Sequence, residues 1–315
     1  MTSSVITRKR AFDDLDEEAR QKWGMEEYVA LQKPDGSGLS FTEKTALMVA
    51  YERRLESERP ADQRLFNDWL ASLLCAEELG DVGKRVSDCM AYGLKTIFDP
   101  KGEIGLGYEG HIQYSAARTC LINDHLTLWL EGHTDTERLK QVVNLGAGLD
   151  TRAFWLEALK NADLYVEVDM KPLCDWKTQL LAKVDAAPLC RRHVISMNFA
   201  EESTKDLPTH GVDFSADTTV TCWLLEGLVM YLKKEEAEQL FLEVSQLSSP
   251  GSYLILNFMK NSPAAEPDLA QEVLLAQGWE REAIVYFGEE GFNYGRYPLG
   301  HAPNTVFGFS FYARK

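Results

Sequence analysis

Val142-Val-Asn-Leu-Gly-Ala-Gly-Leu-Asp-Thr-Arg152 carries the strongest structural signal in this chain. The stretch begins as a short apolar run, which is typical of a buried strand, and passes through Gly146-Ala-Gly148 directly into a helical pattern. Glycine lets the backbone approach a ligand closely, and the N-terminus of the following helix presents N–H groups without intrahelical partners. The stretch therefore predicts a strand, turn and helix that bind a small ligand at the turn.

The residues after the two glycines narrow the choice of ligand. A dinucleotide site favours G-x-G-x-x-G, in which the helix start packs against a pyrophosphate. Here Thr151 takes the third glycine position and Asp150 precedes it. A carboxylate is a poor neighbour for a pyrophosphate, but it suits a ligand with a cationic end, such as the amino acid part of S-adenosylmethionine. Stabilisation of the helix N-terminus is the alternative role for Asp150.

An acidic residue at the end of the next predicted strand completes the pattern. Asp169 closes the strand 164–169 and lies 23 residues after Gly146. A carboxylate in that position can accept hydrogen bonds from both hydroxyls of a ribose. Together the two features predict a fold that binds a nucleoside cofactor. The simpler alternative is a glycine turn with an exposed aspartate.

Strand and helix patterns alternate along the rest of the C-terminal part. Alternation of this kind predicts an α/β fold with a doubly wound, mostly parallel sheet covered by helices on both faces. The late strands alternate apolar and polar residues and are expected to be antiparallel. Besides 142–145 and 164–169, the predicted strands are 193–198, 218–226, 252–258, 283–287 and 305–313, and the helices are 152–159, 176–184 and 235–247.

The first 135 residues have a different sequence pattern, which predicts almost wholly helical structure. The first 40 residues are polar and predict a short helix followed by a turn, and Thr42 is the expected N-cap of the next helix. Further apolar residues recur at helical spacing. We therefore divide the chain into a helical N-terminal cap over residues 1–135, which contributes to the substrate and cofactor site, and a cofactor-binding domain over 136–315. The expected helices lie near 46–55, 65–74, 82–97 and 114–130.

Composition excludes several classes of function. The chain has 315 residues, 45% of them hydrophobic, which is globular, and its formal charge of −16 repels nucleic acid and anionic membranes. No apolar run approaches the ~18 residues of a membrane span, and no secretory signal is evident. The six cysteines are scattered, without C-x-x-C pairs or histidines at ligand spacing. They predict reduced thiols, no metal site and a cytoplasmic location.

The sequence 142–156 and the stretch Tyr165-Val-Glu-Val-Asp-Met-Lys-Pro172 resemble the leucine carboxyl methyltransferase family. The resemblance covers about residues 42–260 and is closer to the microbial small-molecule O-methyltransferases of that family. It implies a Rossmann-like, class I methyltransferase fold and S-adenosyl-L-methionine as cofactor. One segment departs from the family pattern, because Trp69 replaces a proline. Supporting stretches are 45–56, 66–71, 114–118 and 225–232.

The resemblance also assigns roles in holding the cofactor. The guanidinium of Arg118 is expected to pair with the cofactor carboxylate, for which it is a bidentate match. Asp169 is expected to bind the ribose hydroxyls. Asn198 stands where the family usually has an aspartate that meets the adenine amino group. The phosphatase-methylating members of the family also place a basic residue early in the helical part. Here the aligned stretch is Ala50-Tyr51, with Arg53 and Arg54 just beyond it. The remaining predicted cofactor-binding residues are Gly146, Ala147, Gly148, Phe199 and Glu226.

Glu226 and Tyr231 are the predicted catalytic residues, since Glu226 is expected to face the cofactor ammonium group or the methyl-transfer centre. The resemblance implies methyl transfer to a carboxylate or hydroxyl oxygen, or to nitrogen, of a small molecule. Alternatives are a protein C-terminal carboxyl methyltransferase of the phosphatase type and a cofactor-binding protein without catalysis. No nucleic-acid or membrane partner is expected. The candidate substrate residues are Tyr51, His111, Tyr114, Trp223, Arg296 and His301.

Overall fold

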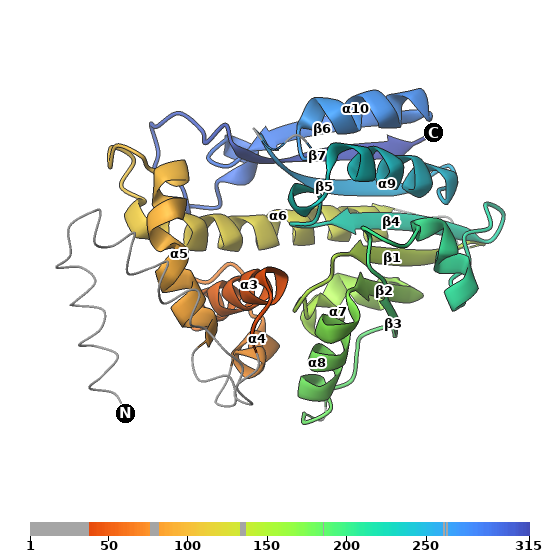
Figure 1. Cartoon of the computed structure of the whole chain (residues 1–315), viewed down its shortest axis with the longest axis horizontal. Coiled ribbons are helices and arrows are strands. Elements are labelled where there is room, and N and C mark those ends of the chain that lie inside the picture. Colours follow the sequence, from red (N-terminus) through yellow and green to blue (C-terminus); the bar gives the residue numbers. More distant parts are fainter. Residues whose placement is uncertain (1–37, 76–81, 133–136, 185, 261, 263) are drawn as a thin grey trace.

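A seven-stranded sheet in the order β3-β2-β1-β4-β5-β7-β6 forms the centre of the molecule (Figure 1). The computed structural model describes residues 38–75, 82–132, 137–184, 186–260, 262 and 264–315. The strands are β1 (Leu139–Leu145), β2 (Leu164–Asp169), β3 (Arg191–Ser196), β4 (Thr219–Leu225), β5 (Tyr253–Met259), β6 (Trp279–Tyr286) and β7 (Phe307–Arg314).

The sheet is mixed and mostly parallel, as the alternating sequence pattern predicts. β1 lies between β2 and β4, with Val143 opposite Val166 on one side and Trp223 on the other. The late strands form antiparallel pairs: β7 pairs with β5, with Phe311 opposite Ile255, and also with β6. The predicted fold class is therefore confirmed, including its antiparallel edge.

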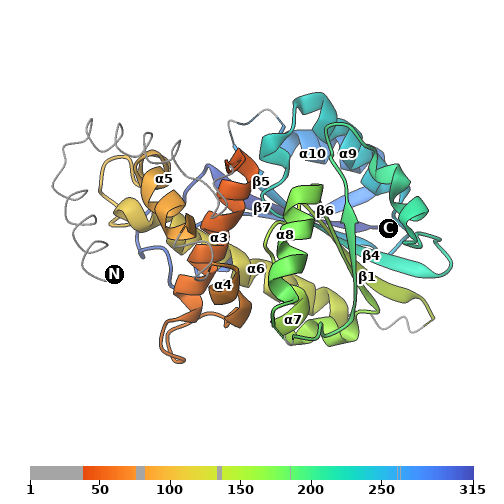
Figure 2. The same cartoon turned by 60° about the horizontal axis from the view of Figure 1, so that its bottom comes forward.

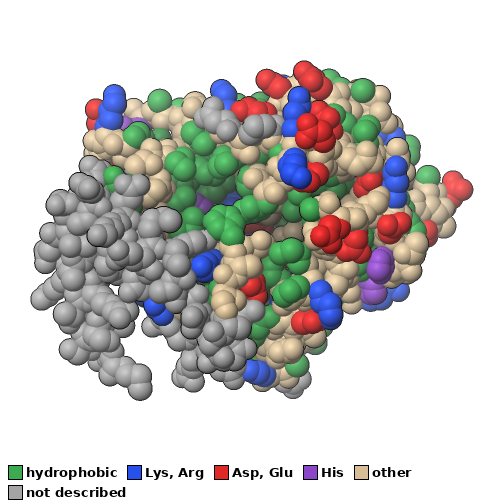
Figure 3. Space-filling model, in the orientation of Figure 1, with side chains coloured by type: hydrophobic (Ala, Val, Ile, Leu, Met, Phe, Trp, Pro, Cys, Tyr) green, Lys and Arg blue, Asp and Glu red, His purple; other side chains and the backbone are tan. Residues whose placement is uncertain are grey.

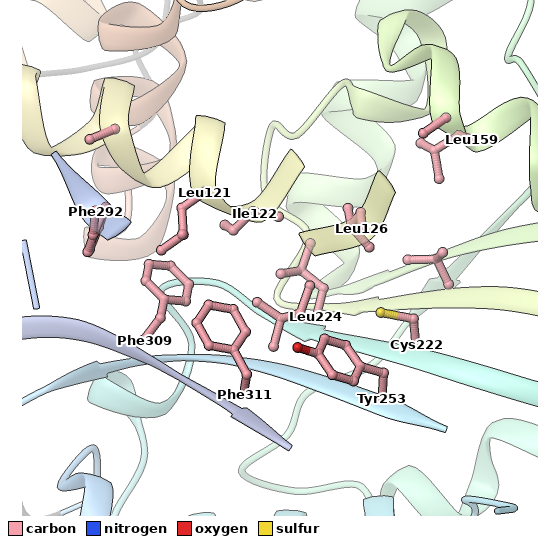
Figure 4. Close-up of a cluster of buried hydrophobic side chains, with 14 of the residues drawn as sticks. Leu121, Ile122, Leu126, Leu159, Cys222, Leu224, Tyr253, Phe292, Phe309 and Phe311 are labelled. Atoms are coloured by element: carbon pink, nitrogen blue, oxygen red, sulfur yellow. The ribbon is translucent and has the colours of Figure 1, made fainter. Parts of the chain in front are cut away.

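Helices cover both faces of the sheet. On one face lie α6 (Gly110–Gly132), α7 (Arg152–Trp155) and α8 (Lys171–Leu181), and on the other α9 (Lys234–Gln246) and α10 (Pro267–Ala276) (Figure 2). Period-two alternation separates the two cores. Leu224 of β4 lies in the same core as Leu126 of α6 (Figure 4). The preceding residue along β4, Trp223, belongs to the core beneath α9.

The remaining helices stand beside the sheet, near the carboxyl ends of its parallel strands (Figures 1 and 2). They are α3 (Phe41–Ser57), α4 (Trp69–Leu74) and α5 (Val82–Phe98). α3 begins with a capping box in which Ser40 accepts from the Glu43 N–H and Glu43 from the Ser40 N–H. The prediction of Thr42 as N-cap is therefore wrong, since a serine with a glutamate three residues later satisfies two backbone donors.

Two other helices are shorter than predicted. The helix expected over 65–74 begins at Trp69, because the Asp68 carboxylate accepts from the Ala71 N–H and caps it there. The helix expected over 152–159 is the single turn of α7, followed by a 3₁₀ turn. The 3₁₀ segments are η1 (Gly107–Glu109), η2 (Glu157–Asn161), η3 (Thr204–His210), η4 (Val229–Tyr231) and η5 (Glu290–Phe292).

The short helix predicted within the first 40 residues falls almost entirely outside the described part of the chain. α10 has no counterpart in the sequence prediction. None of the helices in the described ranges combines the length and the apolar character needed to cross a membrane.

Candidate functional site

A cavity of about 500 Å³ lies where the strand ends meet the N-terminal helices. We call it the central cavity. Its lining comes from the carboxyl ends of β1, β2, β3 and β4 and the segments that follow them, from β5 and β7, and from α3, α5 and α6. The molecular surface in this view is hollowed near its centre, with hydrophobic side chains around the hollow (Figure 3). Open α/β sheets bind ligands at the carboxyl ends of their strands, so the position fits a binding site.

The glycine turn after β1 forms one wall. Gly146 and Gly148 adopt positive φ angles of 74° and 45°, a conformation that favours glycine. The Gly146 and Ala147 N–H groups donate to the Val168 carbonyl at 2.8 and 3.1 Å, which ties the turn to β2. A Cβ on Gly146 would lie 3.1 Å from the Leu228 side chain. The turn is thus held tightly while its backbone stays open to the cavity.

Asp169 lies beside this turn at the end of β2. Its Oδ2 accepts from the Gly148 N–H at 2.6 Å and its Oδ1 from the Met170 N–H at 2.7 Å. Burial raises the pKa of this carboxyl group above its usual value, although the two backbone donors act in the opposite direction. Carboxylate oxygens accept more than one hydrogen bond, so this rigidly held group can also receive donors from a ligand.

Asn198 and Phe199 extend the same wall after β3, and both line the central cavity. The Asn198 Oδ1 accepts from the Ala200 N–H at 3.2 Å, and its own N–H donates to the Glu202 carboxylate. These bonds fix the segment that follows β3.

Arg118 and Glu226 meet at the cavity from opposite sides. Arg118 comes from α6 and Glu226 follows β4, and Nε and Oε1 lie 2.8 Å apart. Arg152 donates to the other carboxylate oxygen of Glu226 at 2.7 Å. Burial disfavours the charged carboxylate, but Arg152 and Arg118 outweigh it and lower the pKa of Glu226. Glu226 is therefore an ionised group between two guanidinium groups.

Asp150 is the second carboxylate of this cluster. It accepts from the backbone N–H and Nη1 of Arg152 at 2.9 and 2.7 Å, and from Arg53 Nη1 at 3.3 Å. Asn144 and Tyr165 donate to it as well. Burial opposes its ionisation, yet Arg152 and Arg53 hold its pKa well below the usual range. Asp150 thus accepts hydrogen bonds from the first backbone N–H of α7 and from two arginine side chains of the same chain. These bonds hold the glycine turn in place.

Arg53 is a site residue that the sequence interpretation missed. It lies on α3, lines the central cavity and has a side chain only 4% exposed. Its Nε lies 4.0 Å from Asp68 Oδ2, and Arg118, the other arginine of the lining, pairs with Glu226. Two buried guanidinium donors facing one cavity fit the carboxylate of an amino acid. The sequence signal for it was its place just beyond Ala50-Tyr51, the stretch aligned with the basic residue of the phosphatase-methylating members.

Two of the six predicted substrate residues, His111 and Tyr114, line the central cavity, and so does the predicted catalytic residue Tyr231. The Tyr114 hydroxyl accepts from the Asn257 amide at 2.9 Å. Tyr231 is 45% exposed and its ring packs edge-on against Phe41, with centroids 5.8 Å apart. The roles of these residues stay predictions.

The other four predicted substrate residues do not line this cavity. Trp223 is fully buried on the far side of β4, where it stacks on Phe214 and donates to Ser248. Arg296 pairs with Glu56 and lines a separate, smaller cavity. Tyr51 packs among the helices of the N-terminal part, and His301 is exposed.

The chain is similar in sequence to known proteins. Residues 46–245 match the model of the family described as leucine carboxyl methyltransferase. A Parafrankia sp. protein is 36% identical over 217 residues, which cover 69% of this chain and 63% of that protein. A Mycolicibacterium smegmatis protein is 30% identical over 250 residues, 78% of each chain. The names of both assign them provisionally to the S-adenosyl-L-methionine-dependent methyltransferases.

Among solved structures, the chain is similar to a protein of the DUF574 family from Streptomyces avermitilis, with a TM-score of 0.50. The match covers 86% of this chain and 97% of that one at 12% identity, so the similarity concerns the fold alone.

Proposed function

The chain belongs to the leucine carboxyl methyltransferase family of S-adenosyl-L-methionine-dependent methyltransferases, and we propose that it transfers a methyl group to an oxygen atom of a small molecule. One observation carries the proposal. All the residues assigned to the cofactor from the sequence line a single cavity, although they lie at or just after the ends of four different strands or on α6. They are Arg118, Gly146, Ala147, Gly148, Asp169, Asn198, Phe199 and Glu226.

The chemistry of these residues suits the parts of the cofactor. Arg118 and Arg53 would hold its carboxylate, and Glu226 would accept from its ammonium group. Asp169 would accept from the ribose hydroxyls, and Asn198 would meet the adenine. When bound, the cofactor supplies an electrophilic methyl group on a sulfonium. The chain's own task is to hold the acceptor in line with that methyl group and to exclude water.

The rest of the lining supports a small acceptor. Side chains from α3, α5, β5 and β7 form an apolar section of the cavity, and a volume of about 500 Å³ is typical of small-molecule pockets. The residues of this section include Met48, Met90, Leu94, Met259 and Phe307.

Isothermal titration with S-adenosylhomocysteine tests the cofactor half of the proposal. We expect micromolar binding by the wild type and at least about tenfold weaker binding by Asp169→Asn, since a charged hydrogen-bond acceptor is lost. Asp175→Asn is the matched control, because Asp175 is an exposed carboxylate on α8 that pairs with Lys171. If the wild type binds neither S-adenosylmethionine nor S-adenosylhomocysteine, the proposal fails.

Methyl-labelled cofactor tests the acceptor half. After incubation with a cell extract, we expect the label in the organic-extractable small-molecule fraction. Label found only in precipitated protein would instead favour the protein carboxyl methyltransferase alternative.

A further inference from the structure

A histidine and a glutamate outside the cofactor-binding set form a buried pair at the central cavity. The His111 Nδ1 lies 2.9 and 2.8 Å from the two carboxylate oxygens of Glu52. Glu52 is 0% exposed, and His111 lines the cavity. Glu52 comes from α3 and His111 from α6, so the pair exists only because the two helices pack together.

Two hydroxyl groups hold Glu52 in place. Ser115 of α6 donates to its Oε2 at 2.5 Å, and Ser87 of α5 donates to its Oε1 at 3.4 Å. An ionised carboxylate only accepts hydrogen bonds, so the proton of the neutral imidazole belongs on Nδ1 and the lone pair on Nε2. A carboxylate that orients a histidine in this way also stabilises the imidazolium that forms when Nε2 takes up a proton.

The imidazole ring is fixed by packing, and Nε2 remains available. Phe98 and Tyr114 contact the ring, with centroids 5.9 and 5.7 Å away. Within the described part of the chain, the side-chain hydrogen bonds of His111 are made by Nδ1. Because the ring lines the cavity, a molecule inside it can reach this nitrogen.

The charges of the lining disfavour an acidic acceptor. In the described part of the lining, every side chain that can be cationic already has a carboxylate partner. Arg53 pairs with Asp150, Arg118 with Glu226 and His111 with Glu52. Arg53 and Arg118 are also the residues assigned above to the cofactor carboxylate, so with the cofactor bound a carboxylate acceptor would find no further cation in this lining. It is also ionised at neutral pH and needs no base, whereas a hydroxyl acceptor must lose a proton.

We propose that His111 is the general base of the reaction, that Glu52 is its positioning residue, and that the acceptor is a hydroxyl group on an apolar skeleton. The inference rests on the methyl transfer proposed above. In the step, the hydroxyl proton passes to His111 Nε2 while the oxygen forms a bond to the methyl carbon. The methyl–sulfur bond breaks, its electron pair stays on sulfur as a neutral thioether, and the imidazolium later releases the proton to water.

Binding distinguishes the two acceptor classes without any turnover. With S-adenosylhomocysteine present, calorimetry compares 2-naphthol with 2-naphthoic acid, which differ only in the reacting group. We expect 2-naphthol to bind at least about tenfold more tightly, because the naphthoate would be desolvated without a cation. Equal or tighter binding of naphthoate overturns the inference, and so does an absence of 2-naphthol binding.

Kinetics with two phenols separates a base from a structural residue. We expect His111→Gln to lower kcat for 2-naphthol by about 10²- to 10⁴-fold. For the more acidic 6-cyano-2-naphthol the loss should be much smaller, because that phenol ionises more readily by itself. His210→Gln is the control, since His210 is exposed and only its backbone carbonyl has a recorded contact. Equal losses with both phenols, or transfer to 2-naphthoic acid, overturn the inference.

The pH profile tests the pair. The titratable groups that contact the imidazole are Glu52 of α3 and Tyr114 of α6, and α5 presents the uncharged Phe98. Around Glu52 itself lie the uncharged Ser87 of α5 and the charged Arg118 of α6. We expect the wild-type kcat for 2-naphthol to rise with pH to a plateau as the imidazole loses its proton. Glu52→Gln should move that rise to lower pH, because the imidazolium loses its carboxylate partner. An unmoved profile contradicts the role of Glu52.

If the wild type does not bind S-adenosylhomocysteine, the proposed function and this inference both fail. Intact cofactor binding with methyl transfer to carboxylic acids alone would leave the proposed function in place and defeat only the assignment of His111.

Discussion

Arg118 on α6 and Glu226 after β4 form a buried ion pair, with Nε and Oε1 2.8 Å apart and both side chains 8% exposed. The pair joins the N-terminal helices to the strand ends. It also holds the guanidinium group at the cavity wall before any ligand arrives. Preorganised charges of this kind reduce the cost of binding an anionic group.

Replacement of Arg118 by methionine should weaken S-adenosylhomocysteine binding by about ten- to hundredfold, since a charge-assisted hydrogen bond contributes about 1.5–3 kcal/mol. Isothermal titration measures the change. Arg54→Met is the matched control, because Arg54 lies on α3 and pairs with Glu58 at the surface. A similar loss in both variants would contradict a role of Arg118 in binding.

Asp150→Asn should destabilise the protein by about 3–5 kcal/mol, because it leaves Arg53 and Arg152 buried with less opposing charge. Urea unfolding measures this change, with Asp175→Asn as a nearly neutral control. A change below about 1 kcal/mol would show that the cluster compensates for the lost charge.

The stability difference between the wild type and Asp150→Asn should depend on pH. The folded-state pKa of Asp150 lies below its ordinary value of 3.8, because Arg152 and Arg53 outweigh the effect of burial. Its contribution to stability is therefore complete above that ordinary value and is lost as the pH falls toward the folded-state pKa. The stability difference between wild type and variant should be constant near neutrality and should shrink below about pH 4. A constant difference down to acid pH would contradict the assignment.

Two glycine substitutions should have opposite effects. Gly146→Ala places a Cβ at positive φ and close to Leu228, which costs about 1–2 kcal/mol, and it should also weaken cofactor binding. Gly93 is an exposed residue in the middle of α5, and no atom lies near a Cβ added there. Gly93→Ala should therefore stabilise the protein by about 0.5–1 kcal/mol. Equilibrium unfolding of both variants checks the signs, and a neutral Gly146→Ala would indicate a turn that relaxes easily.

His125 should make stability depend on pH. It stacks on Phe311, with ring centroids 3.5 Å apart, and burial lowers its pKa to about 4, although Asp124 acts in the opposite direction. The unfolded chain then binds more protons than the folded chain between about pH 4 and 6.5, so stability rises with pH in this window. The unfolding midpoint in urea should fall more from pH 7 to pH 5 in the wild type than in His125→Phe. Equal shifts would refute the prediction.

Much of the site follows from local pattern. The apolar run before Gly146 and the acid at Asp169 are visible in the chain because a strand, a tight turn and a strand end each require particular residues nearby. Parallel strands bring their carboxyl ends to one edge, so residues after β1, β2, β3 and β4 meet without further information.

The side chains between helices could not be predicted in this way. Glu52 and His111 are 59 residues apart in sequence, and Arg53 and Asp150 are 97 apart. No periodicity relates such positions, because helix docking alone decides which faces meet. Trp223 is an opposite case: the sequence predicts it as a substrate residue, but its side chain packs in the core between the sheet and α9.

The alternation of strands and helices, the glycine turn and the strand-end acid are thus visible in the sequence itself. The buried pair of His111 and Glu52 and the arginine cluster were decided by tertiary packing. The physical reason is that a buried charge is tolerated only where a partner lies within hydrogen-bond distance, and those partners come from distant segments.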